Sequence, residues 1–511
     1  VGMGTLVSVD RTRNLAIIEN GDIHAASLQV VAQADPIEGQ NVASVELVQG
    51  AGSLIGAGVN VAVAYSRVEN IASANIKNIE LAGALRVLAE GTANAAASIV
   101  NGPNIHGIAV GVMTGYAYAQ GTYAARLALP AEGNAQVGSI EVWANTLANA
   151  DTVVEPSLGG VELGAAAVKV NIAIASVSTE VTATIERAGE GTLPSITAAG
   201  HVRVRAELNA AANATVTTAK LIFETVNIAV NVSSAKLSGT QTALVENVEM
   251  TAPSLAVDAL LNQGSGTGAQ ALVGASGGAN VTLQLGGVGA NTATARNAQT
   301  SVARVSTSML NIAGALTIET LGAVRAVADV VAMGTGTPAA VRGTTVTLLN
   351  VALMQTIARA EANLRAQLEL GGATVNAGTL TVRVQYNDDA TAKVAPGGSA
   401  ADVSLGSVTT NTAVADAVTN AQARVSGNGA LTTSGKASVT ATGTGGATAE
   451  GRTVKVDVTA LRISVNTAVA NAMENLQARI EGNAAYDLGS LEVLSEYKGE
   501  GAKATVGGLA M

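Results

Sequence analysis

The stretch HVRVRAEL, from His201 to Leu208, alternates polar and apolar side chains and decides the fold. Such alternation, with β-branched residues at the apolar positions, predicts a β-strand that buries one face. Its apolar triplet, Val202-x-Val204-x-Ala206, recurs along the whole chain in strict or looser form. The nine copies begin at Leu28, Leu85, Ile140, Val202, Leu255, Leu316, Leu380, Ala437 and Leu491. Their eight steps average (491 − 28)/8, or about 58 residues.

A second motif, Ala-x-apolar, closes each repeat and keeps the same period. Its copies begin at Ala74, Ala125, Ala183, Ala243, Ala303, Ala366, Ala423 and Ala478. Two motifs that share one period over most of a chain indicate a repeat array, in which each unit packs on its neighbours. Such an array is typical of a scaffold.

Each repeat has an alternating arm and a longer, more apolar arm, with glycine clusters between them that predict turns. Two arms per repeat favour an all-β fold, a parallel β-solenoid built as a flattened, wide β-helix of about eight to nine repeats. One wide coil per repeat, and two or three narrow coils per repeat, are both compatible with the period. We expect one continuous domain over 1–511, with approximate repeats 1–21 (partial), 22–79, 80–130, 131–188, 189–248, 249–308, 309–371, 372–428, 429–483 and 484–511 (partial).

Two segments, 350–370 and 468–480, have helical propensity. The equivalent segments of other repeats, 176–185 and 233–245, are rich in Thr, Val and Ser and favour strands. Because one structural position should hold one conformation in every copy, we predict strands in all four. A solenoid of alternating strands and helices is the alternative.

In a stack of coils, equivalent residues become lateral neighbours. Asn lies 14 residues before the apolar residue of the closing motif in five repeats, while Ala62, Met113 and Met354 hold this position in the others. Stacked Asn side chains can hydrogen-bond along the axis as a ladder, and Asn can also mark a turn with positive φ. The five residues are Asn171, Asn231, Asn291, Asn411 and Asn466.

Charged side chains also align between repeats. Arg86, Glu141 and Arg203 alternate in sign one position after the start of the triplet. Two positions later the repeats hold Arg205, Asp258, Glu319 and Arg383, which predicts the pairs Arg205–Asp258 and Glu319–Arg383. On a solvated face each pair contributes only some tenths of a kcal/mol, so we expect this charge ladder to fix the register of the coils.

Composition excludes several functional classes. The net charge of −10 argues against nucleic-acid binding, and the absence of Cys excludes thiol chemistry. No apolar run of membrane-spanning length is present, so we expect no membrane insertion of this segment. His24, His106 and His201 lack metal-ligand spacing, and Asp388 and Asp389 are expected to be solvated in a loop. We therefore predict no enzyme, no catalytic or metal-binding residue and no cofactor.

Aromatic residues are few, with one Trp, one Phe and seven Tyr. Tyr116, Tyr118 and Trp143 lie within a short stretch, and exposed aromatic rings on a β-solenoid can stack on sugars. Filling of the local core is the other interpretation of this group. We also expect Tyr65 and Tyr116 to align between neighbouring coils.

The segments Gly138–Ala144 (GSIEVWA), Gly489–Leu494 (GSLEVL) and Gly56–Ala64 (GAGVNVAVA) resemble the repeats of large secreted bacterial filamentous adhesins, of the haemagglutinin-like and leukotoxin type. The resemblance implies an extracellular or cell-surface β-solenoid shaft. We expect a non-enzymatic structural protein, either an adhesin shaft or the building block of a self-assembling filament. Its expected partners are further copies stacked end to end and a host or cell-surface glycan or protein. The alternative is a carbohydrate-binding or carbohydrate-cleaving β-helix of the tailspike or lyase kind.

Overall fold

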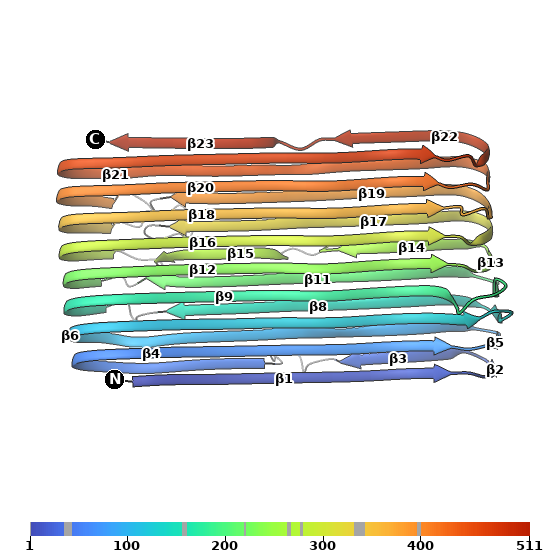
Figure 1. Ribbon diagram of the computed structural model, residues 1–511, viewed down its shortest axis with the longest axis horizontal. Helices are drawn as coiled ribbons and strands as arrows, with labels where there is room; N and C mark the ends of the chain where they lie inside the picture. Colours follow the sequence, from blue (N-terminus) through green and yellow to red (C-terminus); the bar gives the residue numbers. More distant parts are fainter. Residues whose placement is uncertain are drawn as a thin grey trace.

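The computed structural model describes residues 2–34, 43–155, 161–218, 221–262, 267–275, 280–331, 343–395 and 400–510. Within these ranges the chain forms 23 β-strands and no helix (Figure 1). The strands stack in parallel, with the N-terminus at one end of the stack and the C-terminus at the other. The predicted all-β parallel β-solenoid is therefore confirmed.

Each coil passes through a first sheet of long strands, a short corner strand and a second sheet. The first sheet contains β1 (Gly2–Glu19), β9 (Val161–Ala188), β12 (Leu221–Glu246), β16 (Asn280–Ser306), β18 (Gly343–Glu369) and β20 (Ala400–Ser426). The separate corner strands are β2 (Asp22–Ala25), β5 (Asn78–Leu81), β7 (Asn134–Val137), β10 (Ser195–Ala198) and β13 (Glu249–Ala252).

The second sheet contains strands that begin after the corner and strands that continue through it. The first kind comprises β3 (Leu28–Ala34), β8 (Ser139–Glu155), β11 (His201–Thr218), β14 (Ser254–Leu261), β15 (Gly268–Ala275) and β23 (Gly501–Ala510). The second kind comprises β17 (Met309–Val331), β19 (Thr374–Ala395) and β22 (Ala485–Tyr497). Three strands cross between the two sheets without a break: β4 (Ala43–Asn75), β6 (Ala84–Pro130) and β21 (Ala430–Glu481).

Residues pair with their equivalents one repeat away. Val202, for example, lies in register between Ile140 and Leu255. All nine copies of the triplet stack in this way. Each repeat therefore forms one wide coil, which excludes two or three narrow coils per repeat. At about 3.3 Å per residue, the first sheet is roughly 90 Å wide, whereas nine layers about 4.8 Å apart rise only about 38 Å from the first to the last.

The predicted equivalence of the closing motifs is wrong in one repeat. Ala125 pairs with Ala72, and Ala74 pairs with Leu127. All four side chains are buried, so a shift of two residues keeps the same face toward the core. The alternating pattern of the sequence does not distinguish registers that differ by two residues. The remaining closing motifs pair as predicted.

The core between the two sheets is thin, because alanine occupies many of its positions. Side chains of one sheet reach the backbone of the other. The Ser233 hydroxyl donates to the carbonyl of Ala214 at 2.6 Å, and the Asn70 amide donates to the carbonyl of Glu90 at 2.6 Å. A Cβ at Gly91 would lie only 2.6 Å from the Asn70 amide nitrogen. Small residues therefore set the distance between the sheets.

A column of glycines turns most coils from the corner into the second sheet, and Ala26 and Pro253 hold the equivalent position in two coils. The N–H of Gly138 donates to the carbonyl of Gly83 at 2.8 Å, and that of Gly200 donates to the carbonyl of Gly138 at 2.6 Å. A Cβ at Gly138 would lie 2.7 Å from the carbonyl oxygen of Ala82. Glycine is needed here because the backbones of successive turns approach closely.

The two segments with helical propensity are strands, as predicted. Residues 350–369 belong to β18, and residues 468–480 belong to β21. Every residue of the first segment up to Glu369 pairs in register with β16 on one side and β20 on the other. These ladder hydrogen bonds and the buried alanines outweigh the intrinsic preference for a helix.

Candidate functional site

The asparagine ladder forms in the core of the first sheet. Asn171 donates to Asn231 and Asn231 donates to Asn291, each at 2.8 Å. Asn411 donates to Asn466 at 2.8 Å, and Met354 separates the two runs. All five residues lie in strands and none has positive φ, so the interpretation as turn residues is wrong.

The ladder position in the first full coil differs from the prediction. Asn60, and not Ala62, lies in register with Met113 and with Gly4 of the preceding coil. The cause is the shift of two residues described above. Asn60 is also buried, so an amide occupies this position in six coils, and in four of them, those of Asn60, Asn171, Asn231 and Asn411, it is buried.

Two of the predicted charge pairs form between neighbouring coils of the second sheet. Arg86 Nε lies 3.2 Å from a carboxylate oxygen of Glu141. Arg383 meets Glu319 through two contacts of 3.0 and 3.1 Å, which is bidentate geometry. Such pairs hold opposite charges side by side along the stacking axis and so favour one register.

The predicted pair Arg205–Asp258 does not form, although the two residues are in register. Arg205 instead pairs with Glu207 at 2.9 Å and lies 5.6 Å from the ring centroid of Trp143. Asp258 is paired with Arg203, at 3.0 Å. A cation–π contact with the neighbouring coil therefore holds Arg205, and the long side chain of Arg203 reaches Asp258 diagonally.

The three aromatic residues do not form one platform. Tyr116 and Tyr118 stack on the outer face of the first sheet, with ring centroids 6.0 Å apart and planes at 10°. Trp143 belongs to β8, on the outer face of the second sheet. Tyr65 pairs in register with Tyr118, not with Tyr116, and its hydroxyl donates to Gln120 at 2.7 Å.

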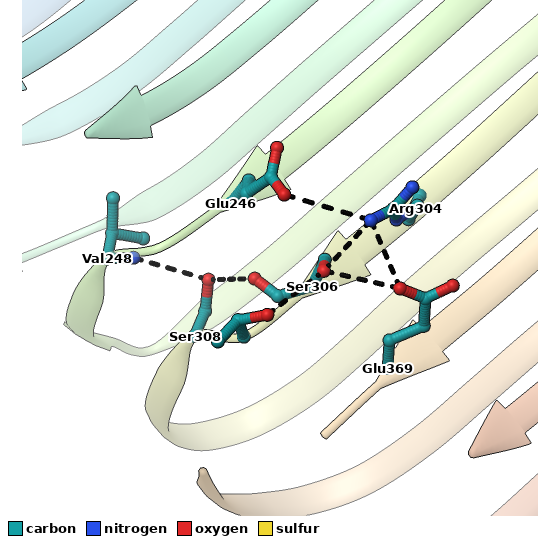
Figure 2. Close-up of polar contacts among 7 residues, drawn as sticks. Glu246, Val248, Arg304, Ser306, Ser308 and Glu369 are labelled. Atoms are coloured by element: carbon teal, nitrogen blue, oxygen red, sulfur yellow. Dashed lines mark hydrogen bonds and ion pairs between the residues drawn. The ribbon is translucent and has the colours of Figure 1, made fainter. Parts of the chain in front are cut away.

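A charge network at the end of the first sheet was missed by sequence reasoning. Arg304 lies between Glu246 and Glu369 of the two neighbouring coils, at 3.7 and 3.1 Å (Figure 2). It also donates to the hydroxyl of Ser306, which in turn donates to Glu369. One guanidinium thus connects β12, β16 and β18 where the coil enters the corner.

The closing motif contains the signal for this network. Its middle residue is Arg in Ala125-Arg126-Leu127, Ala303-Arg304-Val305 and Ala423-Arg424-Val425, and several repeats place Glu directly after the apolar residue. The structure brings these together, because the Arg of one coil meets the Glu of the next. The further pairs are Arg126–Glu186 and Arg424–Glu481.

A buried ion pair was also missed. Lys169 Nζ lies 2.9 Å from a carboxylate oxygen of Glu224, and the two side chains are 12% and 0% exposed. Lys169 comes from the apolar arm of its repeat, where a single charge gives no hint of a partner 55 residues later. Removing either partner would leave the other charge in the core without this ion pair.

Asp388 is fully buried in β19, so the expectation of a solvated loop was wrong. Thr419 donates to one of its carboxylate oxygens at 2.6 Å, and Tyr386 donates to Glu474 nearby. Burial raises the pKa of Glu474 to about 7, with a smaller contribution from the negative charge of Asp388. Burial likewise raises the pKa of Asp388. These groups form a buried acidic cluster near the C-terminal end.

The described residues include no group of three or more His, Cys, Asp or Glu side chains that could hold a metal ion. His24 contacts Glu80 on the surface, at 2.9 Å. Within the described ranges there is also no helix with the length and apolarity to cross a membrane.

Comparison with known proteins gives no relative. No family model matches the chain, no curated protein matches it, and no solved structure matches it. The fold and its ladders are therefore the basis for any statement about function.

Proposed function

We propose that this chain is a non-enzymatic structural protein, the β-solenoid shaft of an extracellular bacterial adhesin or surface filament. In this role the coil stack transmits position and force, and the backbone hydrogen bonds along the axis resist unfolding and proteolysis.

The observation that carries the proposal is the use of polar residues for stacking. Asn231 binds its equivalents in both neighbouring coils, and Arg304 binds one glutamate in each neighbouring coil, Glu246 and Glu369. A side chain that binds the coils above and below it stabilises the stack along its axis. A repeat array that uses its polar groups in this way supports a scaffold role.

The edges of the stack support continuation along the axis. Among the described residues, β1 pairs with β4 on one side, and its other side presents unpaired backbone groups. An open edge of this kind accepts a further strand. We propose that another coil stacks there, contributed by the same polypeptide or by a second copy.

Electron microscopy of the purified protein, together with a proteolysis time course, tests this function. We expect particles that lengthen along the stacking axis and a β-sheet core that survives proteinase K. Release of reducing sugars from a panel of bacterial and host polysaccharides would contradict the non-enzymatic role.

Glycan binding is the second candidate, and the stacked pair Tyr116–Tyr118 favours it. A glycan array compares the wild type with Tyr116→Ala/Tyr118→Ala, and Trp143→Ala on the opposite sheet is the matched control. A glycan signal that only the tyrosine variant loses would support a binding role. Equal or absent signals in all three proteins would argue against glycan binding by the tyrosine pair, and the shaft role would remain as the single candidate.

A further inference from the structure

The outer face of the first sheet carries an apolar patch at the start of its strands. Val110, Val168, Ile228 and Val288 stack in register on neighbouring coils. Each side chain is more than a third exposed. Soluble monomers rarely expose a continuous apolar area larger than a few hundred Å².

The patch consists of three columns of outward-facing residues. Each column contains Ile108, Val110 or Val112 of β6 together with the residues in register with it in every coil up to β21. These columns contain no ionisable side chain among the described residues. In the column of Ile108, Leu349 of β18 and Leu461 of β21 are 54% and 65% exposed. We call this surface the apolar stripe.

The area of the apolar stripe matches a protein–protein interface. Seven strands about 4.8 Å apart span about 34 Å, and the five residues from the first column to the third, at about 3.3 Å each, span about 17 Å, which gives roughly 570 Å². Two such surfaces together would bury about 1,100 Å², above the roughly 1,000 Å² that a specific interface needs. Farther along the same strands the outward column changes to Lys236, Arg296 and Arg359, which supplies a polar rim.

We propose that the apolar stripe binds the apolar stripe of a second copy of this chain, so that two solenoids pair face to face. Two identical surfaces without charges meet without electrostatic repulsion, which a two-fold interface requires. Flat sheets pack against each other about 10 Å apart at a small angle. This lateral pairing is distinct from growth along the stacking axis.

Sedimentation velocity from 1 to 50 μM tests the proposal with the variant Ile228→Lys/Val288→Lys. Both side chains point outward, so we expect an unchanged circular dichroism spectrum. The wild type should sediment as a species of twice the mass of the variant, whose lateral association should be at least 100-fold weaker. The control Leu147→Lys changes an equally exposed residue of the second sheet and should remain dimeric.

Three results would overturn the inference. One is a monomeric wild type at 50 μM, including one whose stripe binds lipid vesicles or a fluorescent apolar dye. Another is a dimer that survives both lysines. The third is an open series of oligomers that the lysines leave intact, which would assign association to the coil edges and not to the stripe.

Discussion

Arg203 pairs with Asp258 although the residue in register with Asp258 is Arg205. The diagonal pair exists because Arg205 is held by Trp143 and Glu207. A double-mutant cycle should therefore find a coupling of about 1 kcal/mol between Arg203→Met and Asp258→Asn. The same cycle with Arg205→Met should give a coupling near zero. Urea denaturation measures both, and a stronger coupling to Arg205 would contradict the observed geometry.

The buried amide ladder should contribute more to stability than an exposed one. Asn231→Ala leaves the Asn171 donor and the Asn291 acceptor without their partner, which should lower the free energy of unfolding by about 2–3 kcal/mol. The control is Asn420→Ala, because Asn420 is exposed and accepts from Asn475 at 3.3 Å. Its effect should stay within about 0.5 kcal/mol. Equal losses of unfolding free energy in urea titrations of the two variants would show that the buried ladder stabilises the protein no more than the exposed pair.

The glycine column should not tolerate a methyl group. Gly138→Ala brings a Cβ within 2.7 Å of a carbonyl oxygen, so we expect a loss of about 2 kcal/mol or more. Gly111→Ala is the matched control, since its Cβ would meet nothing within 4 Å. It should be neutral or stabilise the protein by about 0.5 kcal/mol. Thermal unfolding of both variants gives the comparison, and a harmless Gly138→Ala would refute the steric argument.

The buried acidic cluster should make the C-terminal coils less stable as pH rises. The folded state raises the pKa of Glu474 to about 7, above its ordinary value of 4.5. The folded state therefore binds this proton more tightly than the unfolded state does. The stabilisation by protonated Glu474 is complete below pH 4.5 and is lost as pH rises through about 7. Hydrogen exchange in β19 and β21, corrected for the intrinsic pH dependence, should quicken between these values. Glu474→Gln should weaken the trend and leave only the part that Asp388 contributes, and an unchanged trend in that variant would mean that Glu474 does not cause it.

The repeat period of the sequence predicts the stacked-coil fold. Val202 and its eight equivalents predict the stack of coils, and all of them pair as expected. The width of the coil could not be derived, because a period of about 58 residues fits one wide turn or several narrow ones. The predicted register in the first repeat was wrong for a related reason, since Ala72 and Ala74 lie on the same buried face of the strand.

The polar contacts were only partly predictable. Alignment of repeats finds Asn171–Asn231 and Glu319–Arg383, because both connect equivalent positions. It does not find Arg203–Asp258, which crosses two positions and depends on a third residue. Nor does it find the burial of Asp388, because the side of a strand that faces the core follows from the register of the coil.

Single-particle cryo-electron microscopy at side-chain resolution tests the central claim most directly. That claim is that each repeat forms one wide coil and that polar residues bind their equivalents along the axis. We predict layers about 4.8 Å apart, one layer per repeat, with the side chains of Asn171, Asn231 and Asn291 in a continuous row. Two or three narrower layers per repeat, or asparagines pointing to solvent, would contradict the account.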